Sequence, residues 1–149
     1  MTDHRSVSIV MIEDDEGHAR LIEKNIRRAG ILNEITHFTD GTSALDYLFN
    51  HADGPALNGP ALILLDLNLP DMSGTDILVK IKAEGSALKR TPVVVLTTTD
   101  DKVEIQRCYD LGCNVYITKP VNYESFAQAI RQLGLFLSVI QVPDIEGDA

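Results

Sequence analysis

Five apolar stretches alternate along the chain with segments in which apolar positions recur every three or four residues. Two of the stretches, 61–65 and 92–96, are apolar without alternation, which is typical of strands covered on both faces of a sheet. The stretch 31–38 is the weakest, with Ile35 and Phe38 as its clearest apolar members. Each stretch predicts a strand, and the expected strands are 7–12, 31–38, 61–65, 92–96 and 114–117.

The segments between these strands predict amphipathic helices. In the first, apolar residues occupy one face and Gly30 ends the pattern; the apolar positions are Ala19, Ile22, Ile26 and Ala29. Four more helices are expected, after Asp40-Gly41, after the turn 71–74, after the N-cap candidates 97–100 and from the cap Asn122 to about Gln141. Asp101 is interpreted as a helix-start acid that the helix dipole favours, without a catalytic part. Strict alternation of strands and helices predicts right-handed crossovers and a parallel sheet covered on both faces.

Composition narrows the class of protein. The 149 residues, 44% of them hydrophobic, suit one domain, expected over 1–149 with a core at about 6–137 and a C-terminal extension at 138–149. The formal net charge of −9, without a basic cluster, argues against nucleic-acid binding. No apolar segment approaches the roughly 20 residues that cross a bilayer, and residues 1–8 lack a signal-peptide core. We therefore expect a cytoplasmic protein with no nucleic-acid or membrane partner.

Cysteine and histidine spacing gives no sign of a transition-metal or redox centre. Cys108 and Cys113 match no metal-binding or redox pattern, so we expect small buried thiols. The four histidines are scattered without the spacing of metal ligands.

Polar residues follow four of the predicted strands at their carboxyl ends. They are Glu13 and Asp14, Asp66, Thr97 and Lys119. Taken singly, Asp66 is typical of a turn cap, Thr97 of a helix cap and Lys119 of a solvated charge. In an open parallel sheet, however, the carboxyl ends of the strands form the ligand-binding edge. The sequence therefore predicts that these five side chains share one site.

The chemistry of this set points to a cation and a phosphoryl group. Three neighbouring carboxylates repel one another unless a cation joins them, and an all-oxygen set suits Mg²⁺. A lysine and a hydroxyl at the same place supply the positive charge and the hydrogen-bond donor that an incoming phosphoryl group requires. The simplest reaction is in-line transfer of a phosphoryl group onto Asp66, which gives an acyl phosphate.

The motifs, in this order, resemble the receiver domains of two-component response regulators over residues 6–137. The resemblance rests on the acidic pair Glu13-Asp14, the block 66–74 (Asp-Leu-Asn-Leu-Pro-Asp-Met-Ser-Gly), Thr97 and the run 116–120 (Tyr-Ile-Thr-Lys-Pro). It implies an α/β, flavodoxin-like (βα)5 doubly wound sandwich. The parallel five-stranded sheet would have the order 2-1-3-4-5, with an extended C-terminal helix. Position 13 is Glu where many receivers carry Asp, a change that the family tolerates.

The resemblance also implies the metal ligands. Asp14 and Asp66 would bind Mg²⁺ directly, together with the backbone carbonyl of Asn68. Glu13 would act through a coordinated water molecule. The sequence therefore makes Mg²⁺ the expected cofactor.

The same resemblance assigns the phosphoryl chemistry and the switch. Asp66 would be the phospho-acceptor, with Lys119 and Thr97 contacting the phosphoryl oxygens. Tyr116 would turn inward once Thr97 moves, although a packing role for this ring stays open. The family also implies a cis bond between Lys119 and Pro120.

The last predicted helix is apolar nearly all round at its end, which predicts a homodimer. Only one face of this helix can pack against the sheet, and the apolar residues Leu135, Phe136, Val139 and Val142 lie outside that face. We expect this overhang and the face of strand 114–117 to self-associate; the alternative is a tail folded back on its own domain. Because no residues follow Ala149 for an output domain, the signal is expected to leave through a surface of this domain.

The run 135–143, together with the motifs at 66–70 and 93–98, looks like response regulators that work with bacterial phytochrome kinases. The donor would be a phosphohistidine on a sensor histidine kinase, a bacteriophytochrome. Asn68 and Thr99 would then flank the acyl phosphate.

Three other functions use similar residues. An unphosphorylated scaffold or phosphate sink stays open. A Mg²⁺-dependent aspartyl-phosphate phosphatase needs an acid where the chain has Asn68. A nucleotide-binding module needs a glycine-rich loop after the first strand, where the chain carries acids.

Overall fold

The apolar run Ala61–Leu65 forms the central strand, β3, of a five-stranded parallel sheet. A computed structural model describes residues 7–49, 60–119 and 123–137, with the side chains of 124–132 in the last segment. The strand order is β2-β1-β3-β4-β5, and every neighbouring pair is parallel. The strands are β1 (Ser8–Ile12), β2 (Ile35–Phe38), β3 (Ala61–Leu65), β4 (Val93–Thr97) and β5 (Val115–Thr118). The expected flavodoxin-like fold class and strand order are confirmed.

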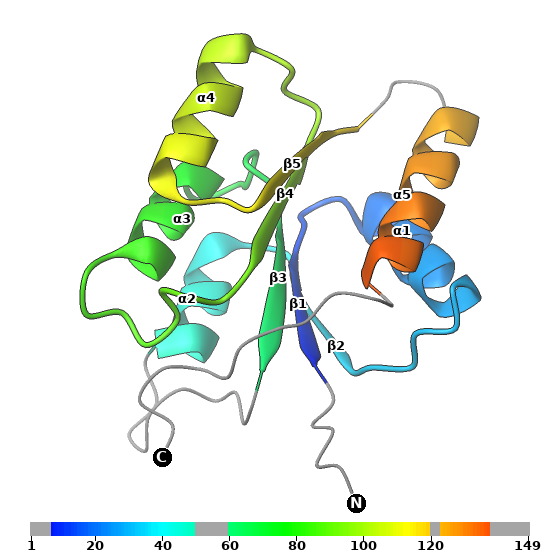
Figure 1. The fold of residues 1–149 in the computed structure, drawn as a ribbon, viewed down its shortest axis with the longest axis horizontal. Helices are drawn as coiled ribbons and strands as arrows, with labels where there is room; N and C mark the ends of the chain where they lie inside the picture. Colours follow the sequence, from blue (N-terminus) through cyan, green and yellow to red (C-terminus); the bar gives the residue numbers. More distant parts are fainter. Residues whose placement is uncertain (1–6, 50–59, 120–122, 138–149) are drawn as a thin grey trace, which may run out of the picture.

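Helices cover both faces of the sheet, as crossover connections between parallel strands require. Helices α1 and α5 lie side by side on one face, and α2, α3 and α4 cover the other (Figure 1). The helices are α1 (Glu16–Arg28), α2 (Gly41–Phe49), α3 (Gly74–Lys82), α4 (Lys102–Leu111) and α5 (Tyr123–Leu137). Among the described residues, no helix is both long and apolar enough to cross a membrane.

The core consists of two apolar layers that share β3. Ile63 and Leu65 pack toward α2, α3 and α4, whereas Leu62 and Leu64 pack toward α1 and α5. All four side chains are buried because helices cover both faces of this strand. This is the physical reason why the sequence of β3 is apolar without alternation.

β1, β4 and β5 lie within one residue of their predicted bounds, whereas the start of β2 and the N-cap of α4 differ for identifiable reasons. β2 begins at Ile35 rather than at residue 31, because Arg27 ties the preceding segment into a loop. The Arg27 guanidinium donates to the carbonyl oxygens of Ile31 and Asn33, at 3.0 and 2.6 Å. The N-cap of α4 is Asp101, whose carboxylate accepts from the Val103 amide at 2.9 Å, and not a residue of 97–100.

The two thiols are buried and free, as predicted. Burial raises the pKa of Cys113 to about 11, so this thiol is protonated and unreactive near neutral pH.

Several predictions fall outside the described residues and stay predictions. They are the Asn122 cap, the helix end near Gln141, the C-terminal extension 138–149 and the peptide bond to Pro120.

Candidate functional site

The carboxyl ends of four strands bring most of the predicted site residues together. Glu13 follows β1, Asp66 follows β3, Thr97 ends β4 and Lys119 follows β5. Parallel pairing places these ends at one edge of the sheet; for example, the Asp66 amide donates to the Ile12 carbonyl at 2.9 Å. These four side chains are buried, at 5% exposure or less. A buried ionisable group is stable only when it has a partner, so Glu13, Asp66 and Lys119 each need one within the site.

Three carboxylates form the acidic part of the site. Glu13, Asp14 and Asp66 each offer one oxygen, and these oxygens lie within 4.8 Å of one another. Burial raises the pKa of Glu13 to about 8, and the neighbouring Asp66 adds to this rise while Lys119 opposes it. Asp14 is exposed, which leaves one side of the cluster open to water. An oxygen-only set with access for water fits a hard divalent cation such as Mg²⁺.

Lys119 supplies the positive charge of the site. Its ammonium donates to the Glu13 carboxylate, to Asp66 Oδ2 at 3.3 Å and to His18 Nδ1 at 3.1 Å. The two acids and the lysine therefore form a buried, hydrogen-bonded cluster of ionisable groups at the end of the sheet.

His18 was not predicted as a site residue. It lies in the first turn of α1, four residues after Asp14, and reaches Lys119 from there. Its place just after the acidic strand end was the one sequence signal that could have identified it.

Asn68 links Asp66 to the hydroxyl groups of Thr97 and Thr98. Its backbone amide donates to Asp66 Oδ1 at 3.0 Å, which orients the carboxylate. Its side-chain amide donates to the hydroxyl oxygens of Thr97 and Thr98, at 3.2 and 3.4 Å. Asp66 and Thr97 are thus connected through one residue.

Tyr116 lies on β5 and contacts the loop that follows Thr97. Its hydroxyl donates to the Thr99 carbonyl at 2.6 Å, and its half-buried ring packs against the core layer under α2, α3 and α4. Burial raises the pKa of the phenol to about 12, so the hydroxyl remains a donor at neutral pH.

The loop after Asp66 leaves no space for a side chain at Gly74. A Cβ there would collide with the Asp66 carbonyl oxygen and lie 2.7 Å from the Leu67 Cα. The Gly74 amide donates to the Leu67 carbonyl at 2.9 Å and closes the loop. Glycine is therefore required by close approach of the backbone.

Asp71 has a role that sequence reasoning missed. Its carboxylate accepts from the amides of Gly41 and Thr42, both at 2.8 Å, and from the Thr42 hydroxyl. These hydrogen bonds lower the pKa of Asp71 to about 2. The residue caps α2 from the loop after β3, a contact that turn-forming tendency alone does not reveal.

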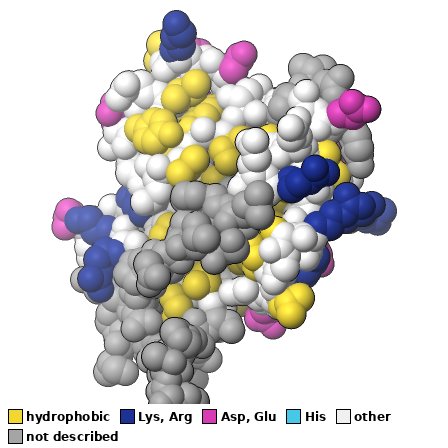
Figure 2. Space-filling model, turned by 45° about the vertical axis from the view of Figure 1, so that its right-hand side comes forward, with side chains coloured by type: hydrophobic (Ala, Val, Ile, Leu, Met, Phe, Trp, Pro, Cys, Tyr) yellow, Lys and Arg dark blue, Asp and Glu magenta, His cyan; other side chains and the backbone are white. Residues whose placement is uncertain are grey.

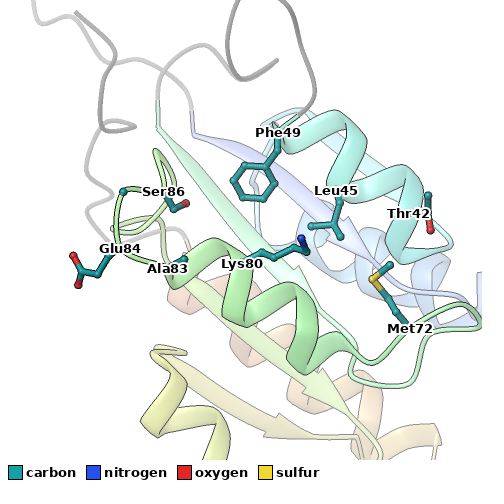
Figure 3. Close-up of a pocket in the computed structure, with 9 residues that line it drawn as sticks. Thr42, Leu45, Phe49, Met72, Lys80, Ala83, Glu84 and Ser86 are labelled. Atoms are coloured by element: carbon teal, nitrogen blue, oxygen red, sulfur yellow. The ribbon is translucent and has the colours of Figure 1, made fainter.

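A separate groove of about 520 Å³ lies between α2 and α3. Leu45 and Phe49 face it from α2, Met72 from the loop before α3, and Lys80 from α3 (Figure 3). None of the acids, hydroxyls or amines of the predicted site lines it.

Family comparison decides the identity of the chain. The response regulator receiver domain family matches residues 9–131, which include the acidic cluster and Lys119. The chain belongs to the response regulator receiver domains.

Solved receiver structures resemble this receiver domain closely. A response regulator receiver domain from Rhodospirillum rubrum is 71% identical, has a TM-score of 0.89, and the match covers 95% of this chain and 100% of that one. The phosphorylated cyanobacterial phytochrome response regulator RcpA is 35% identical with a TM-score of 0.79, over 93% of this chain and 99% of RcpA.

A third relative, response regulator Rcp1 of Synechocystis sp., is 33% identical over 136 residues, or 91% of this chain and 92% of Rcp1. The Mn²⁺-bound form of Rcp1 has a TM-score of 0.81 over 92% of this chain and 99% of that one. This receiver domain is therefore related to phytochrome response regulators, and its acidic cluster fits a divalent cation.

Proposed function

We propose that this receiver domain accepts a phosphoryl group on Asp66 from a sensor histidine kinase, with Mg²⁺ as cofactor. The convergence of three carboxylates and Lys119 at the ends of the strands carries the proposal. Such a set combines a metal site, a nucleophile and a countercharge for the incoming group. The domain would act as a stoichiometric acceptor that takes one phosphoryl group per chain, and not as a turnover enzyme.

The acidic residues would hold the ion. Asp14 and Asp66 would bind it directly, with the backbone carbonyl of Asn68, and Glu13 would act through water. Mg²⁺ would neutralise negative charge on the incoming phosphoryl oxygens. The exposed position of Asp14 supports this arrangement, because Mg²⁺ in proteins retains several water ligands.

Asp66 would be the nucleophile. One carboxylate oxygen would form a bond to phosphorus while the bond from phosphorus to the donor histidine nitrogen breaks, with its electron pair leaving on that nitrogen. The Asn68 amide holds the other oxygen, Oδ1, at 3.0 Å. Lys119 and Thr97 would donate hydrogen bonds to the phosphoryl oxygens, because both are buried beside Asp66 or linked to it.

Thr97 and Tyr116 would form the switch. A hydroxyl of Thr97 drawn to the phosphoryl group would move the start of the loop whose Thr99 carbonyl holds the Tyr116 hydroxyl. A change at Asp66 would thereby reach the surface of β5. The phosphoryl group would bias a two-state equilibrium of this loop and ring.

Signal output would occur through self-association, in phytochrome light signalling. The predicted homodimer uses Leu135 and Phe136, whose side chains lie outside those described, and Val139 and Val142, which lie outside the described residues. Val103, at the start of α4 next to β5, is 76% exposed, so an apolar side chain also reaches the surface on the face of the sheet opposite α5. Figure 2 shows apolar side chains reaching the surface in several places between charged ones. The relation to the phytochrome response regulator RcpA supports a bacteriophytochrome as the kinase.

The proposal is tested by intact mass and light scattering of wild type and Asp66→Asn. Both proteins are incubated with Mg²⁺ and acetyl phosphate, and binding of beryllofluoride controls for rapid hydrolysis. One added phosphoryl group on wild type alone is the expected result. A wild type that binds Mg²⁺ but gains neither a phosphoryl group nor beryllofluoride would leave a scaffold as the better description.

A matched pair of variants tests the dimer. Phe136→Glu, within the predicted interface, is expected to lower the scattering mass at a concentration where wild type associates. Leu32→Glu, at a residue 84% exposed before β2, is the control and is expected to have no effect. Equal masses for wild type and Phe136→Glu would contradict the predicted interface.

A further inference from the structure

Lys119 is held by three acceptors, and one of them is not an acid. Its Nζ contacts the Glu13 carboxylate, Asp66 Oδ2 at 3.3 Å and His18 Nδ1 at 3.1 Å. An ammonium group has three N–H donors and no acceptor, so these contacts use all three. The His18 nitrogen must therefore be the acceptor, with the ring proton on Nε2.

Two contacts fix the position of His18. The backbone amide of His18 donates to Asp15 Oδ1 at 3.0 Å, which places the residue in the capped first turn of α1. Its ring stands edge-on to Phe126 of α5, with centroids 5.3 Å apart and planes at 78°. Asp15 Oδ2 lies 3.8 Å from His18 Nδ1, farther away than the Lys119 Nζ at 3.1 Å. The ring therefore presents Nδ1 to Lys119 from a preset position.

The three acceptors differ in what else they must do. In the proposed function Asp66 receives the phosphoryl group, and Glu13 turns part of its negative charge to the cation. Each acid then accepts a weaker hydrogen bond from Lys119, because its oxygens are shared with the cation or with phosphorus. His18 belongs to neither the metal set nor the acceptor, so its lone pair stays free for Lys119.

We propose that His18 is a positioning residue for phosphoryl transfer, which holds the Lys119 ammonium toward Asp66 while the two acids are occupied. The inference rests on the proposed function of Asp66. A lysine side chain loses considerable rotamer freedom when it is fixed, and an anchor formed in advance removes that cost from the reaction. His18 acts through Lys119 and does not touch the phosphoryl group itself.

The test compares wild type with His18→Phe and His18→Gln. Phenylalanine keeps an aromatic ring against Phe126 but removes the acceptor, whereas glutamine restores an acceptor without the ring. For each protein, Mg²⁺ affinity is measured alone, and beryllofluoride affinity is measured at saturating Mg²⁺. The initial rate of phosphorylation is then recorded against acetyl phosphate concentration.

His18→Phe is expected to bind beryllofluoride about threefold to tenfold more weakly, the usual effect of losing one partly exposed hydrogen bond. The phosphorylation rate is expected to fall in the same proportion. Mg²⁺ affinity is expected to stay unchanged, and His18→Gln to recover most of the loss. A purely structural role for His18 would not separate beryllofluoride affinity from metal affinity in this way.

Unchanged beryllofluoride affinity in His18→Phe, an equal fall in Mg²⁺ affinity, or no recovery in His18→Gln would each overturn the inference. Nitrogen NMR of metal-free wild type gives a readout that does not depend on Asp66, with His18 assigned from the spectrum of His18→Phe. An unprotonated Nδ1 is expected, and a protonated Nδ1 would refute the geometry. Failure of wild type to bind beryllofluoride would instead refute the proposed function.

Discussion

Gly74 is the residue at which a single methyl group tests the geometry of the site most directly. A Cβ at this position would meet two backbone atoms, the Asp66 carbonyl oxygen and the Leu67 Cα, the latter at 2.7 Å. Backbone atoms cannot rotate away as a side chain does, so Gly74→Ala must displace the loop after β3. Overpacking of a buried site costs about 1–3 kcal/mol, and two backbone clashes place this change near the upper end. For a domain of this size, about 3 kcal/mol lowers Tm by about 6–12 °C.

Gly17→Ala is the matched control. Gly17 lies in the first turn of α1, and the nearest atom to a Cβ there is Asp15 Oδ1 at 3.2 Å, the end of an exposed side chain. Alanine favours helix by up to about 1 kcal/mol over glycine, so this variant is expected to be as stable as wild type or slightly more stable.

Urea denaturation gives the free energy of unfolding of both variants, and intact mass after acetyl phosphate treatment gives the extent of phosphorylation. Gly74→Ala is expected to lose stability and phosphorylation together, because the same loop carries the carbonyl and carboxylate of Asp66. If Gly74→Ala were as stable and as readily phosphorylated as Gly17→Ala, the close approach in the loop would be wrong.

Three further predictions concern single groups. Glu13 has a folded pKa of about 8 against an ordinary 4.5, so the metal-free protein holds a proton there that the unfolded chain releases. Its contribution to stability is therefore full below pH 4.5 and lost as pH rises through about 8. Urea denaturation at several pH values should show that the free energy of unfolding depends less on pH in Glu13→Gln than in wild type over this range. An equal pH dependence in the two proteins would contradict the prediction. Asp71 has a folded pKa of about 2 against 3.8, so its contribution is present above pH 3.8 and lost as pH falls through about 2. Acid unfolding monitored by circular dichroism should begin at higher pH in Asp71→Ala than in wild type. Tyr116→Phe removes the donor to the Thr99 carbonyl and should cost about 1 kcal/mol in thermal unfolding, while phosphorylation of Asp66 is retained; loss of phosphorylation would give the hydroxyl a role beyond the switch.

The positions of the site residues are set by the strands, whereas the orientations of their side chains are set by loops. Glu13, Asp66, Thr97 and Lys119 are placed by strand ends, so any chain with this sheet topology brings them to one edge. Their orientation depends on loop contacts, such as the Asn68 amide on Asp66 Oδ1. Variants in the loops are therefore expected to change the chemistry without unfolding the sheet.

The sequence by itself determined the elements, the strand order implied by family likeness, and the edge at which the site lies. Short-range pattern is enough for this, because a run such as 61–65 is apolar throughout only when both faces are covered. The end of α4 also follows from the sequence, because a glycine is typical of a helix C-terminus. Gly112 adopts a φ of 109°, a left-handed conformation that glycine reaches without strain.

Only the tertiary structure decided which distant side chains meet. His18 and Lys119 are 101 residues apart, and Asp71 caps a helix that begins 30 residues earlier. The guanidinium of Arg27 likewise shortens β2 by binding carbonyls that the apolar pattern had assigned to a strand. Such contacts depend on how separate elements pack, and packing distances are not encoded in the local spacing of apolar and polar residues.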